Sequence, residues 1–88
     1  MWYVYIIECV DFTLYTGITN NLEKRISTHN RKMGAKYTKT RTPVKLIYYI
    51  EVENKSIASK EECRIKKLTR KEKLNLVKEV LETMAIIQ

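Results

Sequence analysis

The 88-residue sequence lacks several features that mark common classes of protein. It has no run of the roughly 20 apolar residues that a membrane-spanning helix requires. Its start, MWYVYIIECVDF, lacks the basic segment of a signal peptide and carries a charge at Glu8. Two cysteines, Cys9 and Cys63, are too few for a disulfide framework or for a zinc site of about four ligands. We therefore expect a cytoplasmic protein without a membrane partner, and we expect both cysteines to be reduced thiols in the core.

Repeats, low-complexity tracts and linkers are also absent, and a chain of this length can bury only a modest core. We expect one domain over residues 1–88, with its core in about residues 2–77 and a C-terminal helix that runs to about residue 84. Acidic residues are the minority among the charged ones, because 10 Asp and Glu stand against 17 Lys and Arg, for a net charge of +7. Such a basic domain attracts polyanions, nucleic acid first, although charge alone fits a solvated basic surface equally well.

Hydropathy patterns predict six elements in the order β-β-α-β-α-α. Aromatic and β-branched residues alternate through residues 2–9 and about 13–18, and the short connection near Asp11 predicts an antiparallel hairpin. A third strand is expected at residues 44–52. The fold class is therefore α+β, with a small three-stranded antiparallel sheet flanked by helices.

The helices are expected to begin at polar capping residues. The first would run from Asn20 to about Lys32 and stop at Gly34. The second would begin at Asn54 or Ser56 and run to about residue 68, and the third would begin at residue 69. The apolar stripe of the third helix favours packing on its own domain over a role in binding a protein partner. Its members are Leu74, Val77, Leu81 and Met84.

Three places carry unusual residues where packing would favour apolar ones. In the hairpin, Tyr5 and Tyr15 can be cross-strand neighbours, and on pattern alone this pair favours simple packing over chemistry. Gly17 weakens the second strand, and a glycine there often marks the close approach of a ligand or another backbone. In the first helix, Arg25 and His29 border the apolar stripe and lean toward the sheet. A nearby phosphate would relieve their mutual repulsion, but a snorkelling arginine and a half-buried histidine fit the pattern equally.

The third place is the second helix, where Glu61 and Glu62 lie toward the stripe of Ala58, Ile65 and Leu68. A carboxylate that faces a core is costly unless it is paired or bound to a metal ion. Helical periodicity does not separate the two glutamates, and pairing with a surface cation is the favoured interpretation for Glu61.

Together these segments resemble the GIY-YIG nuclease domain, and within that superfamily a small stand-alone branch of short bacterial-type proteins. The resemblance covers residues 2 to about 77. Its first signature element is VYI at residues 4–6 and its second is YTG at residues 15–17, followed in order by GAKYT, TPVKLIY and ASKEECRIKKLTRKEKLNLV. The first glycine of the signature is a valine here, the last isoleucine is a threonine, and Phe12 stands where this branch often has glycine.

The resemblance implies roles for individual residues. The side chains that match its catalytic positions are Tyr5, Tyr15, Arg25, His29 and Glu62. Glu62, rather than Glu61, matches the metal-binding glutamate, and a single carboxylate suits one hard cation such as Mg²⁺ or Mn²⁺. A tyrosine would deprotonate or orient the attacking water, either Tyr5 with His29 nearby or Tyr15.

The function implied is that of a metal-dependent endonuclease that hydrolyses phosphodiester bonds, in DNA rather than RNA. Cleavage would be directed by nucleic-acid structure or by a targeting protein partner, and the protein would be a monomer or a weak homodimer. Tyr37 would stack on a base or pack at the rim of the site. The expected substrate-binding residues are Gly17, Lys36, Tyr37, Lys39, Arg41, Lys66, Lys67 and Arg70. The alternative is a noncatalytic basic nucleic-acid-binding module that retains the fold, and loss of Arg25 or Glu62 would mark it.

Overall fold

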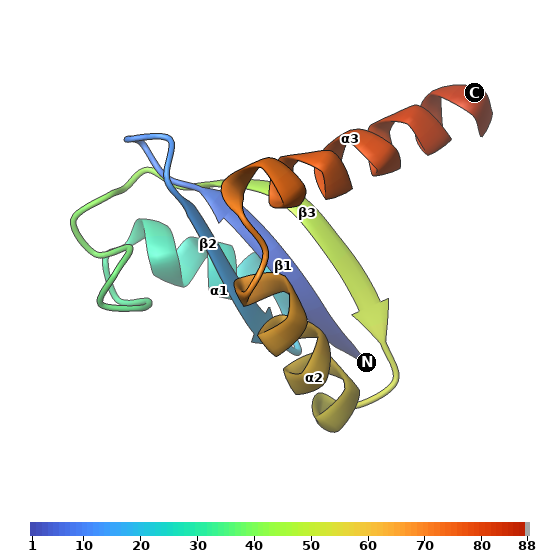
Figure 1. Cartoon of the computed structure of the whole chain (residues 1–88). Coiled ribbons are helices and arrows are strands. Elements are labelled where there is room, and N and C mark those ends of the chain that lie inside the picture. Colours follow the sequence, from blue (N-terminus) through green and yellow to red (C-terminus); the bar gives the residue numbers. More distant parts are fainter. Residues whose placement is uncertain (88) are drawn as a thin grey trace.

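The computed structural model describes residues 1–87, including the side chains of residues 1–82. Its elements follow the predicted order β-β-α-β-α-α, and the three strands form one antiparallel sheet (Figure 1). The elements are β1 (Trp2–Glu8), β2 (Leu14–Thr19), α1 (Leu22–Asn30), β3 (Lys45–Val52), α2 (Lys55–Lys66) and α3 (Arg70–Ile87). The predicted α+β fold class is confirmed.

The central strand is β1, with β2 along one edge and β3 along the other. Tyr5 of β1 lies opposite Gly17 of β2, and Ile7 lies opposite Tyr15. The two tyrosines are therefore diagonal neighbours on one face of the sheet rather than direct cross-strand partners. Diagonal neighbours remain within reach of long side chains, so the register still allows both tyrosines to contribute to one site.

Side chains alternate between the two faces of β1, and each face is covered by different helices. Val4 and Ile6 belong to a core cluster with Ala58 and Ile65 of α2. Tyr5 and Ile7 belong to the opposite cluster, against which side chains of α1 pack. Figure 1 shows α1 on one side of the sheet and α2 on the other. The face that carries Tyr5 is thus the face covered by α1.

The ends of α1 differ from the sequence-based prediction. β2 continues to Thr19, so the capping residue is Asn21, whose side chain accepts a hydrogen bond from the backbone of Lys24. At the other end, Lys32 has a φ of 64°, and the backbone N–H groups of residues 32 and 33 bond to the carbonyls of residues 29 and 28. This pairing is a Schellman motif, in which Lys32 takes the left-handed position that was predicted for Gly34.

The other two helices begin as predicted. Asn54, rather than Ser56, caps α2 by accepting a hydrogen bond from the backbone of Ile57. Thr69 and Glu72 exchange hydrogen bonds at the start of α3, which is the reciprocal arrangement of a capping box. α2 ends at residue 66 rather than near 68, and α3 continues to residue 87, beyond the predicted end near 84.

Two predictions about buried side chains need correction. Cys9 is buried as predicted, but Cys63 is exposed because it lies on the face of α2 that points away from the sheet. On α3, Val77 packs against the core together with Leu76, whereas Leu81 is 61% exposed. The side chain of Met84, the last predicted member of that stripe, lies outside the described side chains.

No helix in residues 1–87 is both long enough and apolar enough to cross a membrane.

Candidate active site

The hairpin places Tyr5 across Gly17. A Cβ atom added to Gly17 would lie 2.5 Å from the phenol oxygen of Tyr5, closer than side chains tolerate. The glycine predicted to admit a close neighbour is therefore needed because the Tyr5 ring leans over β2 at this point. The Tyr5 side chain is fully buried, and its hydroxyl group occupies the space that a side chain at residue 17 would take.

Two side chains of α1, one helical turn apart, converge on that hydroxyl group. Nε2 of His29 lies 3.0 Å from the phenol oxygen, and Nε of Arg25 donates to the same oxygen at 3.3 Å. His29 is fully buried, while Arg25 is half-buried. The prediction that Arg25 and His29 lean toward the sheet is confirmed, and the side chain they meet there is Tyr5.

The loop after α1 supplies a further contact that the sequence did not reveal. Oγ1 of Thr38 lies 2.8 Å from Nδ1 of His29, and the same hydroxyl group donates to the carbonyl of Ala35 at 3.0 Å. Thr38 is fully buried although it lies in an irregular loop rich in exposed residues. A lone threonine in a polar loop carries no periodic signal, so sequence patterns could not have identified this residue.

Burial and the positive charge of Arg25 set the protonation of these groups. Burial, and then the nearby Arg25 guanidinium, lower the pKa of His29 from 6.5 to about 4, so the imidazole is neutral at pH 7. Burial raises the pKa of Tyr5 above 10, and the hydrogen bond from Arg25 opposes this rise. The cluster at neutral pH is therefore a neutral histidine, a neutral phenol and one guanidinium.

Tyr15 lies beside this cluster in a short aromatic stack. Its ring meets the His29 ring edge-on, at 5.5 Å between centroids, and stacks on Tyr37 at 5.9 Å. The guanidinium of Arg41 covers Tyr37 at 4.3 Å from the ring centroid. A nucleic-acid base that stacks on Tyr37 would therefore compete with Arg41 and Tyr15 for the ring.

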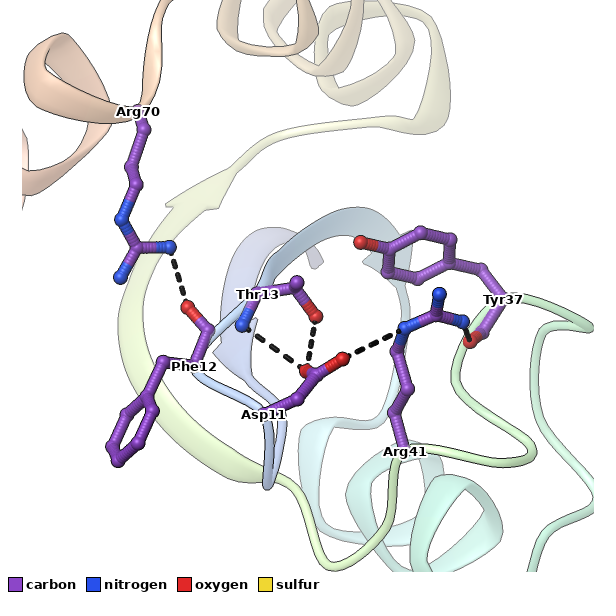
Figure 2. A network of polar contacts seen from close by, with 6 residues as sticks. All are labelled: Asp11, Phe12, Thr13, Tyr37, Arg41 and Arg70. Carbon is purple, nitrogen blue, oxygen red and sulfur yellow. Dashed lines mark hydrogen bonds and ion pairs between the residues drawn. The ribbon is translucent and has the colours of Figure 1, made fainter.

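The turn between β1 and β2 is held by two arginines that approach it from opposite sides (Figure 2). Arg41 forms an ion pair of 3.1 Å with Asp11, and Arg70 donates to the carbonyl of Phe12. Asp11 also accepts from the backbone and the hydroxyl of Thr13. Phe12 has a φ of 66°, so the turn keeps a backbone conformation that favours glycine even though it carries a large side chain.

The two candidate glutamates of α2 have different surroundings. Glu61 is bound by Arg64 through hydrogen bonds to both carboxylate oxygens, as expected for a surface ion pair. The side chain of Glu62 is only 21% exposed, and Lys66 approaches it at 3.7 Å, beyond normal hydrogen-bond distance. Glu62 also lies near enough to Tyr5 for its charge to contribute to the raised pKa of that phenol.

The donor set around Glu62 is small. Among residues 1–87, the structure contains no cluster of three or more His, Cys, Asp and Glu side chains that could surround a metal ion. A single carboxylate oxygen donor fits a hard divalent cation that keeps several waters and shares the oxygens of a phosphate. It does not fit the pair of metal ions that some phosphodiesterases use.

The remaining predicted substrate-binding residues lie on two exposed segments. Lys36 and Lys39 are exposed on the loop after α1. Lys66, Lys67 and Arg70 are exposed at the junction between α2 and α3. A polar pocket of about 220 Å³ opens beside Arg25, and its other lining residues are Thr19, Asn20, Asn21, Lys24 and Thr28.

Comparison with known proteins places the chain in a wider group. A model of the GIY-YIG catalytic domain matches residues 1–75. A UPF0213 protein of Clostridium perfringens is 60% identical over 77 residues, which cover 88% of this chain and 83% of that protein. One from Syntrophus aciditrophicus is 55% identical over 83 residues, 93% of this chain and 95% of that protein. The solution NMR structure of a UPF0213 protein from Bacillus halodurans matches with a TM-score of 0.57 at 40% identity, covering 89% of this chain and 84% of that one.

Proposed function

Because the chain belongs to the GIY-YIG family, which is part of a nuclease superfamily, we propose that it is a divalent-metal-dependent endonuclease that hydrolyses nucleic-acid phosphodiester bonds. The observation that carries this proposal is the convergence of Arg25 and His29 on the buried hydroxyl group of Tyr5. A strand and a helix hold three groups that could move a proton and stabilise phosphate charge within one hydrogen-bonded cluster.

Arg25 is suited to binding the scissile phosphate. Its Nε is committed to Tyr5, and its half-buried guanidinium lies beside the polar pocket. A guanidinium fork can donate two parallel hydrogen bonds to phosphate oxygens, and its charge would stabilise the excess negative charge of the transition state. The Tyr5 hydroxyl is buried, and its partner Arg25 is only half-buried. The attacking water would therefore approach the Tyr5 hydroxyl from the side of Arg25.

The hydrogen bonds support Tyr5 over Tyr15 as the group that activates water. The phenol oxygen of Tyr5 contacts both His29 and Arg25, whereas Tyr15 meets His29 only at the ring edge. In the proposed step, water gives a proton to the phenol oxygen of Tyr5 while the phenol proton passes to Nε2 of His29. The resulting hydroxide attacks phosphorus, and the bond to the 3′ oxygen breaks. The 3′ oxygen takes a proton from solvent water and His29 releases the transferred proton to solvent, which leaves a 5′ phosphate and a 3′ hydroxyl. A phosphate bound at Arg25 would raise the pKa of His29 from its low value in the free protein, because its negative charge offsets that of the guanidinium.

Glu62 would hold the Mg²⁺ or Mn²⁺ ion, whose charge neutralises the scissile phosphate and the leaving 3′ oxygen. The proposed nucleic-acid contacts are phosphate contacts by exposed cations, chiefly Lys36, Lys39 and Lys67. Arg41, Lys66 and Arg70 would contact phosphates with their remaining N–H donors, while Asp11, Glu62 and Phe12 hold their present contacts. DNA as the substrate, a targeting partner, a monomer or weak homodimer, and a cytoplasmic location are parts of the same proposal.

Replacing Glu62 tests the metal assignment. Glu62→Gln preserves the shape of the side chain and removes its charge, so metal-dependent cleavage should fall at least about a hundredfold. Glu61→Gln is the matched control, since it removes a neighbouring carboxylate that is already neutralised by Arg64. Both variants and the parent should be incubated with branched, flapped and single-stranded DNA and RNA, with Mn²⁺ or with chelator, after melting curves confirm that each is folded.

The outcomes separate three interpretations. Cleavage by the parent and by Glu61→Gln, but not by Glu62→Gln, is the expected result. Equal cleavage by all three would show that the metal site is misassigned. No cleavage of any substrate by the parent would favour a noncatalytic nucleic-acid-binding module.

A further inference from the structure

The imidazole of His29 is held from both sides. Nε2 faces the hydroxyl of Tyr5 at 3.0 Å, and Nδ1 faces the hydroxyl of Thr38 at 2.8 Å. All three side chains are fully buried. A neutral imidazole donates from one nitrogen and accepts at the other, so the partners determine which nitrogen carries the hydrogen.

The hydrogen bonds of Tyr5 identify which nitrogen of His29 is the acceptor. Arg25 can only donate, so its bond to the phenol oxygen uses a lone pair of Tyr5. Within the described part of the chain, the phenol hydrogen of Tyr5 has one acceptor in reach, Nε2 of His29. If Nε2 carried the hydrogen, the buried phenol hydrogen would have no partner, which costs about 1–3 kcal/mol. Nε2 is therefore the accepting nitrogen.

The loop after α1 supplies the partner for the other nitrogen of His29, Nδ1. The hydroxyl hydrogen of Thr38 points to the carbonyl of Ala35, which leaves an oxygen lone pair for the hydrogen on Nδ1 of His29. The ring itself lies against Gly34, where an added Cβ would be 2.4 Å from Nδ1. Gly34 thus provides the space for the imidazole, and Thr38 provides the acceptor for its hydrogen.

We propose that Thr38 is a positioning residue that fixes His29 in the Nδ1–H tautomer and so keeps Nε2 available for the proton of Tyr5. The catalytic consequence rests on the proposed function, whereas the tautomer itself is a property of the folded protein without substrate. With the hydrogen on Nδ1, transfer of the phenol proton to Nε2 yields an imidazolium that Thr38 continues to accept from. With the hydrogen on Nε2, the histidine has no lone pair facing Tyr5, and the transfer cannot occur.

The single histidine of the chain makes the tautomer directly measurable. In protein labelled with ¹⁵N-histidine at pH 7, two-dimensional ¹H–¹⁵N spectra distinguish a hydrogen-bearing nitrogen from a bare one. We expect a hydrogen-bearing Nδ1 and a bare Nε2 in the parent protein. Thr38→Val keeps the side-chain shape and removes the hydroxyl, so the signals should shift toward the Nε2–H tautomer. Thr38→Ser should retain the parent spectrum.

Cleavage rates supply the second readout. A wrong histidine tautomer can lower a catalytic rate by up to about 10⁴-fold, and we expect Thr38→Val to cleave at least about tenfold more slowly while Thr38→Ser recovers most of the rate. Thr40→Val, a matched change at an exposed threonine of the same loop, should leave both the spectrum and the rate unchanged.

Each result bears on the proposal. A bare Nδ1 in the parent, or an unchanged tautomer in folded Thr38→Val, would overturn it. If Thr38→Val does not fold, the parent and Thr38→Ser spectra still decide the tautomer. A parent that shows the Nδ1–H tautomer but cleaves no substrate would refute the proposed nuclease function and leave the assignment of the tautomer standing.

Discussion

The chain has only two glycines, and each lies against an aromatic ring of the candidate site. Gly17 leaves space for the Tyr5 ring and Gly34 for the His29 ring. Neither glycine has a positive φ, and the positions that do are occupied by Phe12 and Lys32. The absence of a side chain, rather than backbone freedom, is therefore what these two glycines contribute to the site.

Protonation of His29 should make stability depend on pH. Its pKa is 6.5 in the unfolded chain and about 4 in the folded protein, so between these values the unfolded chain binds the extra proton. The stabilisation is complete above pH 6.5 and is lost as the pH falls toward 4. From pH 7 to pH 5 we expect the free energy of unfolding to fall by about 2 kcal/mol, measured by urea denaturation.

Most carboxylates titrate below this interval, which keeps the histidine effect separable. A folded His29→Gln variant should lose most of the dependence between pH 7 and pH 5. A flat profile in the parent protein would contradict the burial of a neutral histidine.

At the scale of elements, apolar periodicity was enough to predict the order and type of all six, because the helices bury one face and the strands alternate between two faces. Helix ends were harder to predict, since they depend on where the neighbouring strand stops and on backbone geometry. Asn20 and Asn21 are equally good caps by sequence, and only the extent of β2 decides between them. The Schellman position at Lys32 was missed because glycine, the usual residue there, lies two positions later.

Lys32 offers a test of this account of the end of α1. An exposed lysine with a φ of 64° is in a conformation that glycine adopts with less strain. Lys32→Gly should therefore raise the free energy of unfolding by about 0.5–1 kcal/mol, measured by chemical denaturation. Lys32→Ala removes the same side chain without relieving the backbone, so it should not stabilise the protein. If both variants changed the free energy of unfolding equally, the cause would be loss of the lysine charge rather than relief of the backbone conformation.

At the scale of the whole molecule, the fold brings together residues that lie far apart in the sequence. The apolar patterns of the hairpin strands and of the first helix were sufficient to predict that Arg25 and His29 point toward the sheet. Family resemblance was needed to choose Glu62 over Glu61, and the different pairing of these two residues is visible only in the structure. Thr38 could not be predicted, because its role depends on the path of an irregular loop.

The excess of positive charge should control the affinity for nucleic acid. With a net charge of +7 and cations exposed on two segments, binding should displace several counterions. For about four to six phosphate contacts on duplex DNA, we expect log K to fall with log salt at a slope of about −4 to −5. The slope should be measured in chelator, so that cleavage does not interfere. A slope near zero, or no binding at low salt, would argue against any role in binding nucleic acid.

The two arginines that hold the turn between β1 and β2 differ in how much they add to this attraction. Arg41 donates to the carboxylate of Asp11 and the carbonyl of Tyr37, and Arg70 donates to the carbonyl of Phe12 (Figure 2). Each guanidinium keeps N–H donors for a phosphate, but the charge of Arg41 is already partly offset by the carboxylate of Asp11. Asp11 therefore competes with a polyanion for Arg41, whereas the neutral carbonyl of Phe12 leaves the charge of Arg70 uncompensated. The turn thus contributes the full charge of Arg70, but only part of the charge of Arg41, to the attraction of a polyanion.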